Sequence, residues 1–164
     1  MRELFLLIVS ICPGTLAERQ GFTVCYDTIN QRPLWTKHEL KPSTTPSKRR
    51  NWRIDRALNS LPSSAFTNTG FHRGHLVAAA DAPESEDTFL TSNAIAQDPA
   101  LNAGAWRRLE NDIRKRGPAT VLTGAIYNNC GTDKIEAPCV IYKISRFHDG
   151  EILAHFARNA ERRH

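Results

Sequence analysis

One amphipathic helix among strand-like segments is the feature that most limits how this chain can fold. Within residues 102–116, Ala105, Leu109 and Ile113 recur every four residues and form one apolar stripe along a helix. The Gly-Pro pair at 117–118 ends that helix. The other elements that the pattern predicts are strands.

Strand-like segments lie on both sides of this helix. Before it, residues 21–28 alternate between apolar and polar, residues 33–39 are a suitable partner, and residues 89–96 are a short candidate. After it come three more strand-like runs, at 119–127, 140–146 and 151–157, with a hairpin turn at 148–150. Strands, one helix and then strands predict an α+β fold with a central antiparallel sheet. The length of 164 residues is enough for one domain but not for two.

The N-terminus is typical of a secretory signal peptide. Arg2 precedes an apolar run over residues 4–12 that is too short to span a bilayer, and small residues lead up to Ala17. Cleavage after Ala17 would make residues 1–17 the signal and residues 18–164 a single domain. We then expect a secreted or periplasmic protein with no membrane attachment. The alternative is an N-terminal core helix or strand.

The cysteines bear on the same question. Cys12 would leave with the signal, so three would remain, an odd number for an oxidising compartment. Cys130 and Cys139 flank a turn-like segment and are suitably spaced for a bridge, which would leave Cys25 free and buried among apolar neighbours. The chain has no Cys-x-x-Cys pair, so a thiolate zinc site is not expected.

The formal net charge of +5 fits a polyanionic partner, either nucleic acid or an acidic membrane surface. The segment 41–56 is basic and predicted to be an exposed loop, and the tail 158–164 is basic and predicted to be frayed. Further basic residues lie on the helix, at Arg107, Arg108, Lys115 and Arg116. The sequence has no recognition helix for the major groove and no zinc finger, so these cations would contact phosphates without reading sequence.

His75 is the histidine whose surroundings indicate catalysis. Gly74 precedes it, and a glycine there would let the chain approach a ligand closely. A neutral imidazole takes a proton from water near pH 7. Two other interpretations are a purely structural histidine and a metal pair with His72, for which no third ligand is evident.

The helix carries a second polar group. Asn102 lies at its predicted start, where it would serve either as a metal ligand or simply as an N-cap. Glu110 and Arg114 share one edge of the apolar stripe, as site residues or as an ordinary i,i+4 ion pair. A base, an amide oxygen, a carboxylate and a guanidinium are together what hydrolysis of a phosphodiester requires, and Mg²⁺ prefers oxygen ligands.

Several segments, taken in order, resemble the DNA/RNA non-specific endonuclease family of ββα-metal nucleases. The matching segments are Arg-Asn-Trp at 50–52, His-Arg-Gly-His at 72–75, Ser-Asn at 92–93 with Gln97, Leu-Asn-Ala-Gly-Ala-Trp at 101–106 with Leu-Glu at 109–110, and Thr-Gly at 123–124. The resemblance covers residues 21–159. It implies a central antiparallel sheet with a ββα-metal (His-Me finger) catalytic unit.

The resemblance also implies roles for individual residues. His75 matches the base that activates water, and Asn102 matches the one direct protein ligand of Mg²⁺, for which Mn²⁺ is an alternative ion. Glu110 matches the residue that holds metal-bound water. Arg50 matches the arginine that stabilises the transition state, and Arg114 matches one near the leaving group. The implied reaction is endonucleolytic hydrolysis of DNA and RNA that leaves 5′-phosphate ends.

Arg73 and Asn93 match positions that shape the site of the family. The chain departs from the family pattern at His72, where the signature has aspartate, and at Ala96, where it has proline. It also stops about where the family often adds a helix, which suggests a minimal member with less surface for dimer contacts. A monomer, a homodimer and an inhibitor protein all stay open.

His72 motivates a second hypothesis of another class, a catalytically weak nucleic-acid-binding protein on the same fold. A basic cation in place of a carboxylate would alter the field around His75. Such a protein would bind DNA in a salt-sensitive manner in EDTA without cutting it. A third hypothesis is a structural, disulfide-bearing secreted protein.

Overall fold

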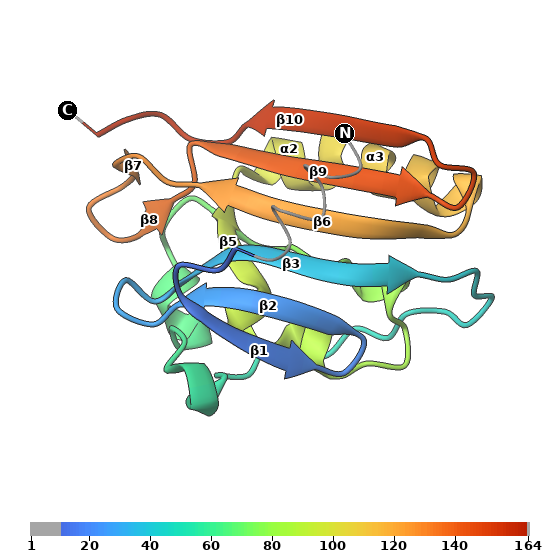
Figure 1. Cartoon of the computed structure of the whole chain (residues 1–164). Helices are drawn as coiled ribbons and strands as arrows, with labels where there is room; N and C mark the ends of the chain where they lie inside the picture. Colours follow the sequence, from blue (N-terminus) through green and yellow to red (C-terminus); the bar gives the residue numbers. More distant parts are fainter. Residues whose placement is uncertain (1–10, 164) are drawn as a thin grey trace.

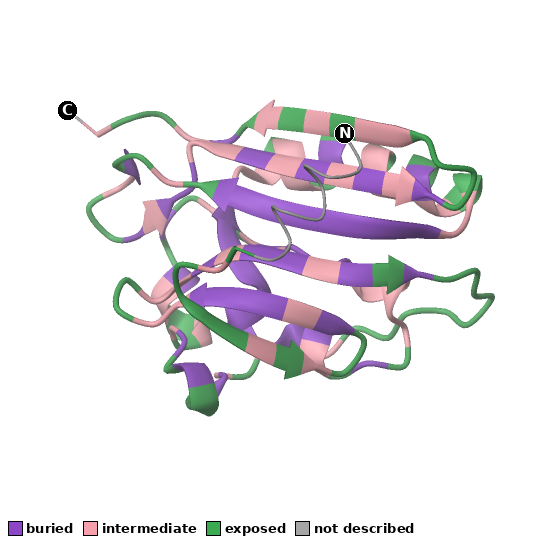
Figure 2. Ribbon diagram, viewed as in Figure 1, coloured by how far each residue is buried: buried purple, intermediate pink, exposed green. Residues whose placement is uncertain are grey.

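A six-stranded antiparallel sheet forms the centre of the computed structural model, which describes residues 11–163 (Figure 1). β6 lies inside the sheet between β3 and β9, and its residues 119–125 are all buried (Figure 2). The strands in spatial order are β1 (Thr15–Arg19), β2 (Phe22–Asp27), β3 (Arg32–Leu40), β6 (Ala119–Ile126), β9 (Val140–Phe147) and β10 (Ile152–Arg158).

Helices and short elements cover one face of this sheet, as Figure 1 shows for α2 (Pro99–Ala103) and α3 (Ala105–Arg116). The apolar stripe of α3 buries Trp106 against Ile141 of β9, and Ile113 against Val121 of β6. In the described part of the chain, no helix combines the length and the apolar character needed to cross a membrane.

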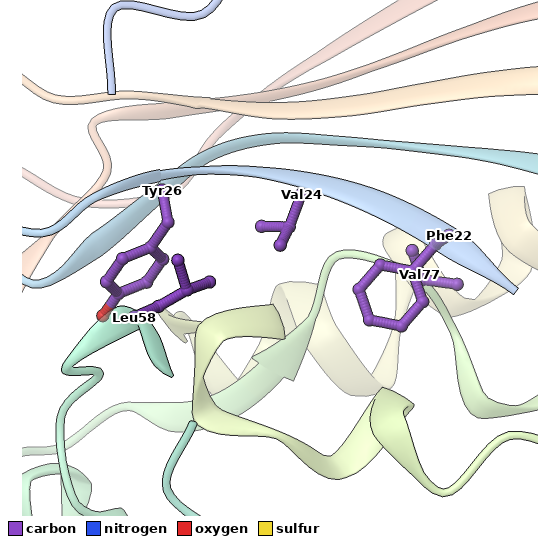
Figure 3. Close-up of a cluster of buried hydrophobic side chains, with 5 residues drawn as sticks. All are labelled: Phe22, Val24, Tyr26, Leu58 and Val77. Carbon is purple, nitrogen blue, oxygen red and sulfur yellow. The ribbon is translucent and has the colours of Figure 1, made fainter. Parts of the chain in front are cut away.

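Small elements complete this layer. Phe22, Val24 and Tyr26 project from β2 toward Leu58 and Val77, which closes the core near the edge of the sheet (Figure 3). The remaining elements are two strand pairs, β4 (His72–His75) with β5 (Ala94–Gln97) and β7 (Cys130–Gly131) with β8 (Glu136–Ala137), and the 3-10 helices η1 (Arg56–Leu58), η2 (Ser63–Phe66), η3 (Ala79–Asp81), η4 (Asp87–Phe89) and η5 (Thr91–Asn93).

The α+β class with a central antiparallel sheet is therefore confirmed, whereas the predicted helix proves to be two. The chain breaks at Gly104, where an added Cβ would overlap the carbonyl oxygen of Ala100. The N-cap of α2 is Asp98, whose carboxylate accepts a hydrogen bond from the backbone nitrogen of Leu101. Asn102 therefore lies inside α2, and its interpretation as an N-cap is wrong.

Two further predictions are corrected. Only the end of residues 89–96 is a strand, because η4 and η5 occupy the segment before β5. The tail is not frayed near Asn159, whose side-chain nitrogen donates to the carbonyl oxygens of Ala96 (3.0 Å) and Pro138 (2.8 Å). The buried Asn159 ties the end of β10 to β5, an interaction between distant segments that local patterns do not indicate.

The prediction of a free Cys25 is also wrong. Cys25 forms a disulfide with Cys12, and the second disulfide joins Cys130 and Cys139 as predicted. The cleavage point expected after Ala17 falls inside β1, which pairs with β2 from Thr15 onward. Residues 1–10 of the expected signal lie outside the described residues.

This arrangement predicts that a chain beginning at Glu18 is less stable than one beginning at Ile11. The shorter chain lacks the Cys12–Cys25 bridge, whose loop of this size is worth about 3 kcal/mol, and three residues of β1. Urea unfolding without reductant measures the difference. The double variant Cys12→Ser/Cys25→Ser is the control, because it removes the bridge and keeps the strand. Equal free energies of unfolding for the two chain lengths would contradict the prediction.

Candidate active site

His75 lies at the end of β4, packed against two aromatic rings that also contact each other. The ring centroids of Trp52 and Phe89 are 4.4 and 4.7 Å from that of His75. Its Nε2 is buried and has no hydrogen-bond partner in the described structure. Burial lowers the pKa of His75 to about 4, so the imidazole is neutral at pH 7. A neutral, partly exposed imidazole can act as a proton acceptor.

The pairing of β4 with β5 fixes the position of this histidine. His75 lies opposite Ala94, and Gly74 lies opposite Ile95. A Cβ at Gly74 would overlap the side chain of Gln97. Gly74 was expected to admit a ligand, but the structure shows that it makes room for Gln97 instead. Strand alternation also directs His72 and His75 to opposite faces of β4, so the proposed histidine metal pair does not form.

Asn102 meets β4 through His72. The Nδ2 atom of Asn102 is 3.3 Å from Nδ1 of His72, and His72 is exposed. A neutral imidazole accepts this hydrogen bond from the amide nitrogen, which leaves Oδ1 of Asn102 as the free end of the amide. The residue that departs from the family pattern thus contacts the expected metal ligand.

Arg114 and Glu110 do not form the ordinary helical ion pair. Nη1 of Arg114 donates to Oδ1 of Asp81 at 2.6 Å, and Nη2 donates to Oδ1 of Asn111 at 2.5 Å. Glu110 makes no hydrogen bond or ion pair with any described residue. Burial raises the pKa of Glu110, an effect that the charges of Lys143 and Arg114 oppose.

A layer of buried charge separates α3 from the sheet, and the sequence patterns did not single it out. Lys143 of β9 is 1% exposed, and its Nζ donates to Oγ1 of Thr123 (2.7 Å) and to the carbonyl oxygen of Leu76 (3.5 Å). Asp81 lies 2.9 Å from Nε2 of His38, which is also buried. The only signal for Lys143 is a charge within an alternating strand, and alternation alone does not say which face is buried.

Arg50 is held at the surface by a weak contact. Its Nη1 donates to Oε1 of Glu86 at 2.8 Å, and the Glu86 side chain is 62% exposed. An exposed ion pair of this kind contributes at most about 1 kcal/mol, so a phosphate can replace Glu86 as the partner of Arg50. Trp52, two residues after Arg50, packs its ring against that of His75.

Arg73 and Asn93 make internal hydrogen bonds. Arg73 donates from Nε and Nη2 to the carbonyl oxygen of Ser63, at 3.1 and 2.8 Å. The fully buried Asn93 accepts from the backbone nitrogen of Val77 and donates to the carbonyl oxygens of Val77 and Thr88. Both therefore fix the loops around β4 rather than presenting free polar groups.

The expected basic surface is also partly committed. Residues 41–49 are exposed, as are Arg107, Arg108 and Lys115 of α3. Arg116 instead donates to Glu151 (2.5 Å) and Asp149 (3.3 Å) in the hairpin after β9. The surface left for phosphates is thus the loop and the outer side of α3 without Arg116.

The structure brings the expected residues together in pairs. His75 packs against Trp52, which is two residues after Arg50. Asn102 contacts His72, and Arg114 binds Asp81. No contact between described side chains joins these three pairs to one another. Asn102 and Glu110 offer an amide oxygen and a carboxylate, which are donors that Mg²⁺ or Mn²⁺ accepts alongside water, although the described residues contain no cluster of three His, Cys, Asp or Glu side chains.

Comparison with known proteins gives relatives of one kind. Endonuclease G, mitochondrial, of Homo sapiens is 35% identical over 110 residues, which are 60% of this chain and 37% of that protein. The Nuclease of Serratia marcescens is 27% identical over 162 residues, 85% of this chain and 61% of that protein. The chain thus spans between about a third and three fifths of the length of these two relatives.

A solved structure matches the fold over nearly the whole chain. It comes from the crystal structure of the EndoG/EndoGI complex, with a TM-score of 0.75 at 18% identity, and the match covers 96% of this chain and 79% of that one. The sequence profile of the DNA/RNA non-specific endonucleases matches residues 11–159. The chain therefore belongs to the DNA/RNA non-specific endonuclease family.

Proposed function

We propose that this protein is a metal-dependent nuclease that hydrolyses DNA and RNA without sequence preference and leaves 5′-phosphate ends. The observation that carries the proposal is the geometry of β4: His75 at its end packs against Trp52 and Phe89, and His72 at its start contacts Asn102 of α2. Membership of the family supports it, as do nuclease-named relatives such as the Serratia marcescens protein.

His75 is the proposed general base. Its uncharged ring accepts the proton of the attacking water, and the aromatic rings of Trp52 and Phe89 keep it from charging in the free protein. Arg50 and Arg114 stabilise the negative charge that develops on the phosphate. The exposed loop 41–49 binds neighbouring phosphates, which explains affinity without sequence reading.

A divalent ion would be held by Oδ1 of Asn102, with Glu110 binding water on the ion. We propose Mg²⁺, with Mn²⁺ as an alternative, because both donors are oxygen atoms. When bound, the ion supplies positive charge to the phosphate oxygens. Glu110 accepts hydrogen bonds, and its lack of an ion pair with described residues keeps its oxygens available for that purpose.

The variant His75→Ala tests this assignment. We expect its rate of cleavage of plasmid DNA and of structured RNA, each with Mg²⁺, to fall by about 10²- to 10⁴-fold, the usual contribution of a general base. His148→Ala is the matched control, because His148 is exposed in the hairpin turn after β9. A wild-type protein that leaves both substrates intact, or a His75→Ala protein that cuts as fast as wild type, would refute the proposal.

The second candidate, a nucleic-acid-binding protein with little activity, rests on His72. Its contact with Asn102 weighs against that candidate, because Nδ1 of His72 accepts the same hydrogen bond that an aspartate oxygen would accept. We therefore propose that His72 is compatible with catalysis.

The variant His72→Asp separates the two candidates. The nuclease proposal predicts cutting by the wild type and a change of less than about tenfold in His72→Asp. The binding protein would show DNA retention in EDTA, no wild-type cleavage, and cleavage gained only in His72→Asp. His148→Asp adds the same carboxylate at another exposed position and controls for the change in net charge.

We also propose that the chain is exported to an oxidising compartment. The apolar run over residues 4–12 and the two disulfides support such a destination. Cell fractionation with N-terminal sequencing of the exported chain tests this proposal. A chain that stays in the reducing cytosol with both disulfides open would refute it.

A further inference from the structure

Two carboxylates, those of Glu110 and Asp81, are candidate ion-pair partners for Arg114. Glu110 lies one turn earlier on α3, at the i,i+4 spacing that normally pairs such residues. Asp81 approaches from η3, outside the helix. The guanidinium binds Asp81, with 2.6 Å between Nη1 and Oδ1, and its second nitrogen binds Asn111 on the same helix. Arg114 is thereby held away from Glu110.

The side chain of Asp81 is itself held in place by a second partner, His38. Its side chain is 5% exposed, and its Oδ2 lies 2.9 Å from Nε2 of the buried His38 on β3. Burial alone would raise the pKa of Asp81, but His38, Lys143 and Arg114 outweigh it and lower that pKa to about 2. The carboxylate is therefore a permanent anion with one oxygen for Arg114 and one for His38.

As a result, Glu110 has no hydrogen-bond or ion-pair partner among residues 11–163. The nearby buried cation, Lys143, is committed to Oγ1 of Thr123 and the carbonyl oxygen of Leu76, so it acts on Glu110 by charge and not by contact. A carboxylate in this setting keeps its oxygens free for water molecules. A carboxylate bound to Arg114 would not.

We propose that Asp81 is a positioning residue for the metal site: by holding Arg114, it keeps the carboxylate of Glu110 free to bind water on the divalent ion. The inference rests on the proposed nuclease function. Removal of Asp81 leaves Arg114 with Glu110 as the α3 carboxylate at the favourable i,i+4 spacing, whereas Asp112, two residues away, points to another side of the helix. The helical ion pair then forms, and Glu110 loses its capacity to hold metal-bound water.

Isothermal titration with Mg²⁺ alone, without nucleic acid, tests the proposal on the full chain. We expect Asp81→Asn to weaken Mg²⁺ binding by about tenfold, the usual effect of losing a residue that supports a metal ligand. The double variant Asp81→Asn/Arg114→Met removes the competing guanidinium as well. Its Mg²⁺ affinity should return to within about threefold of wild type, although cleavage stays slow because Arg114 is absent.

Asp55→Asn is the matched control. Asp55 is also 5% exposed and binds an arginine, with 2.8 Å between its Oδ2 and Nε of Arg19 in β1; its other side-chain partner is Ser92 of η5, and it makes no hydrogen bond or ion pair with α3 in the described structure. We expect this variant to lose thermal stability, as Asp81→Asn does, and to bind Mg²⁺ as wild type does. Weakened Mg²⁺ binding in Asp55→Asn would show that any lost buried pair disturbs the site, and it would overturn the specific role of Asp81.

Other outcomes decide the remaining cases. Unchanged Mg²⁺ affinity in a folded Asp81→Asn protein, or no recovery in the double variant, overturns the inference. If Asp81→Asn does not fold, the variant Arg114→Met is measured instead. A wild-type Mg²⁺ affinity in Arg114→Met supports the proposal. A tenfold higher Mg²⁺ affinity overturns it, because Arg114 would then already compete for Glu110 in the wild type. A wild-type protein that cuts nucleic acid while Asp81→Asn binds Mg²⁺ normally refutes this inference only. A wild type that cuts nothing refutes the nuclease function.

Discussion

Lys143 and Asp81 bring two ionisable side chains into the layer between the central sheet and α3, where a charge without a partner costs several kcal/mol. Each is therefore tied to a different element: Lys143 to Thr123 and the backbone of Leu76, and Asp81 to His38 and Arg114. These bonds connect β3, β6, β9, η3 and α3. The placement of α3 over the sheet thus follows from charge pairing as well as from its apolar stripe.

Burial shifts the pKa values of the two groups that the proposed reaction needs in opposite directions. At His75 it disfavours the charged form, and the aromatic surroundings offer no anion to oppose it, so the ring stays neutral. At Glu110 burial also disfavours the charged form, but Lys143 and Arg114 lie near enough to oppose it. His75 thus lies in an apolar environment that suits a proton acceptor, and Glu110 lies near positive charges that suit a carboxylate.

The sequence predicted what depends on local patterns and missed what depends on distant partners. Alternation located β2, β3 and the last three long strands, and the motif around His75 indicated the candidate site. The first three residues of β1 were assigned to a signal because Thr15-Leu16-Ala17 offers small residues at a cleavage position, a local pattern that does not distinguish a cleavage site from an edge strand. Asp81 and Arg114 are 33 residues apart, and no periodicity marks their pairing. The i,i+4 rule instead favoured Glu110 as the partner, which is wrong.

The break at Gly104 shows why one straight helix would not build this site. α3 must turn Trp106 and Ile113 toward the sheet to bury its stripe. Asn102 must face β4 to contact His72, which lies in the β4–β5 pair and not in the central sheet. A continuous helix fixes the angle between these two directions, whereas a break lets each segment satisfy its own contact. The close approach of the Ala100 carbonyl to Gly104 leaves no room for a side chain at the break, so glycine is what lets core packing and the site coexist.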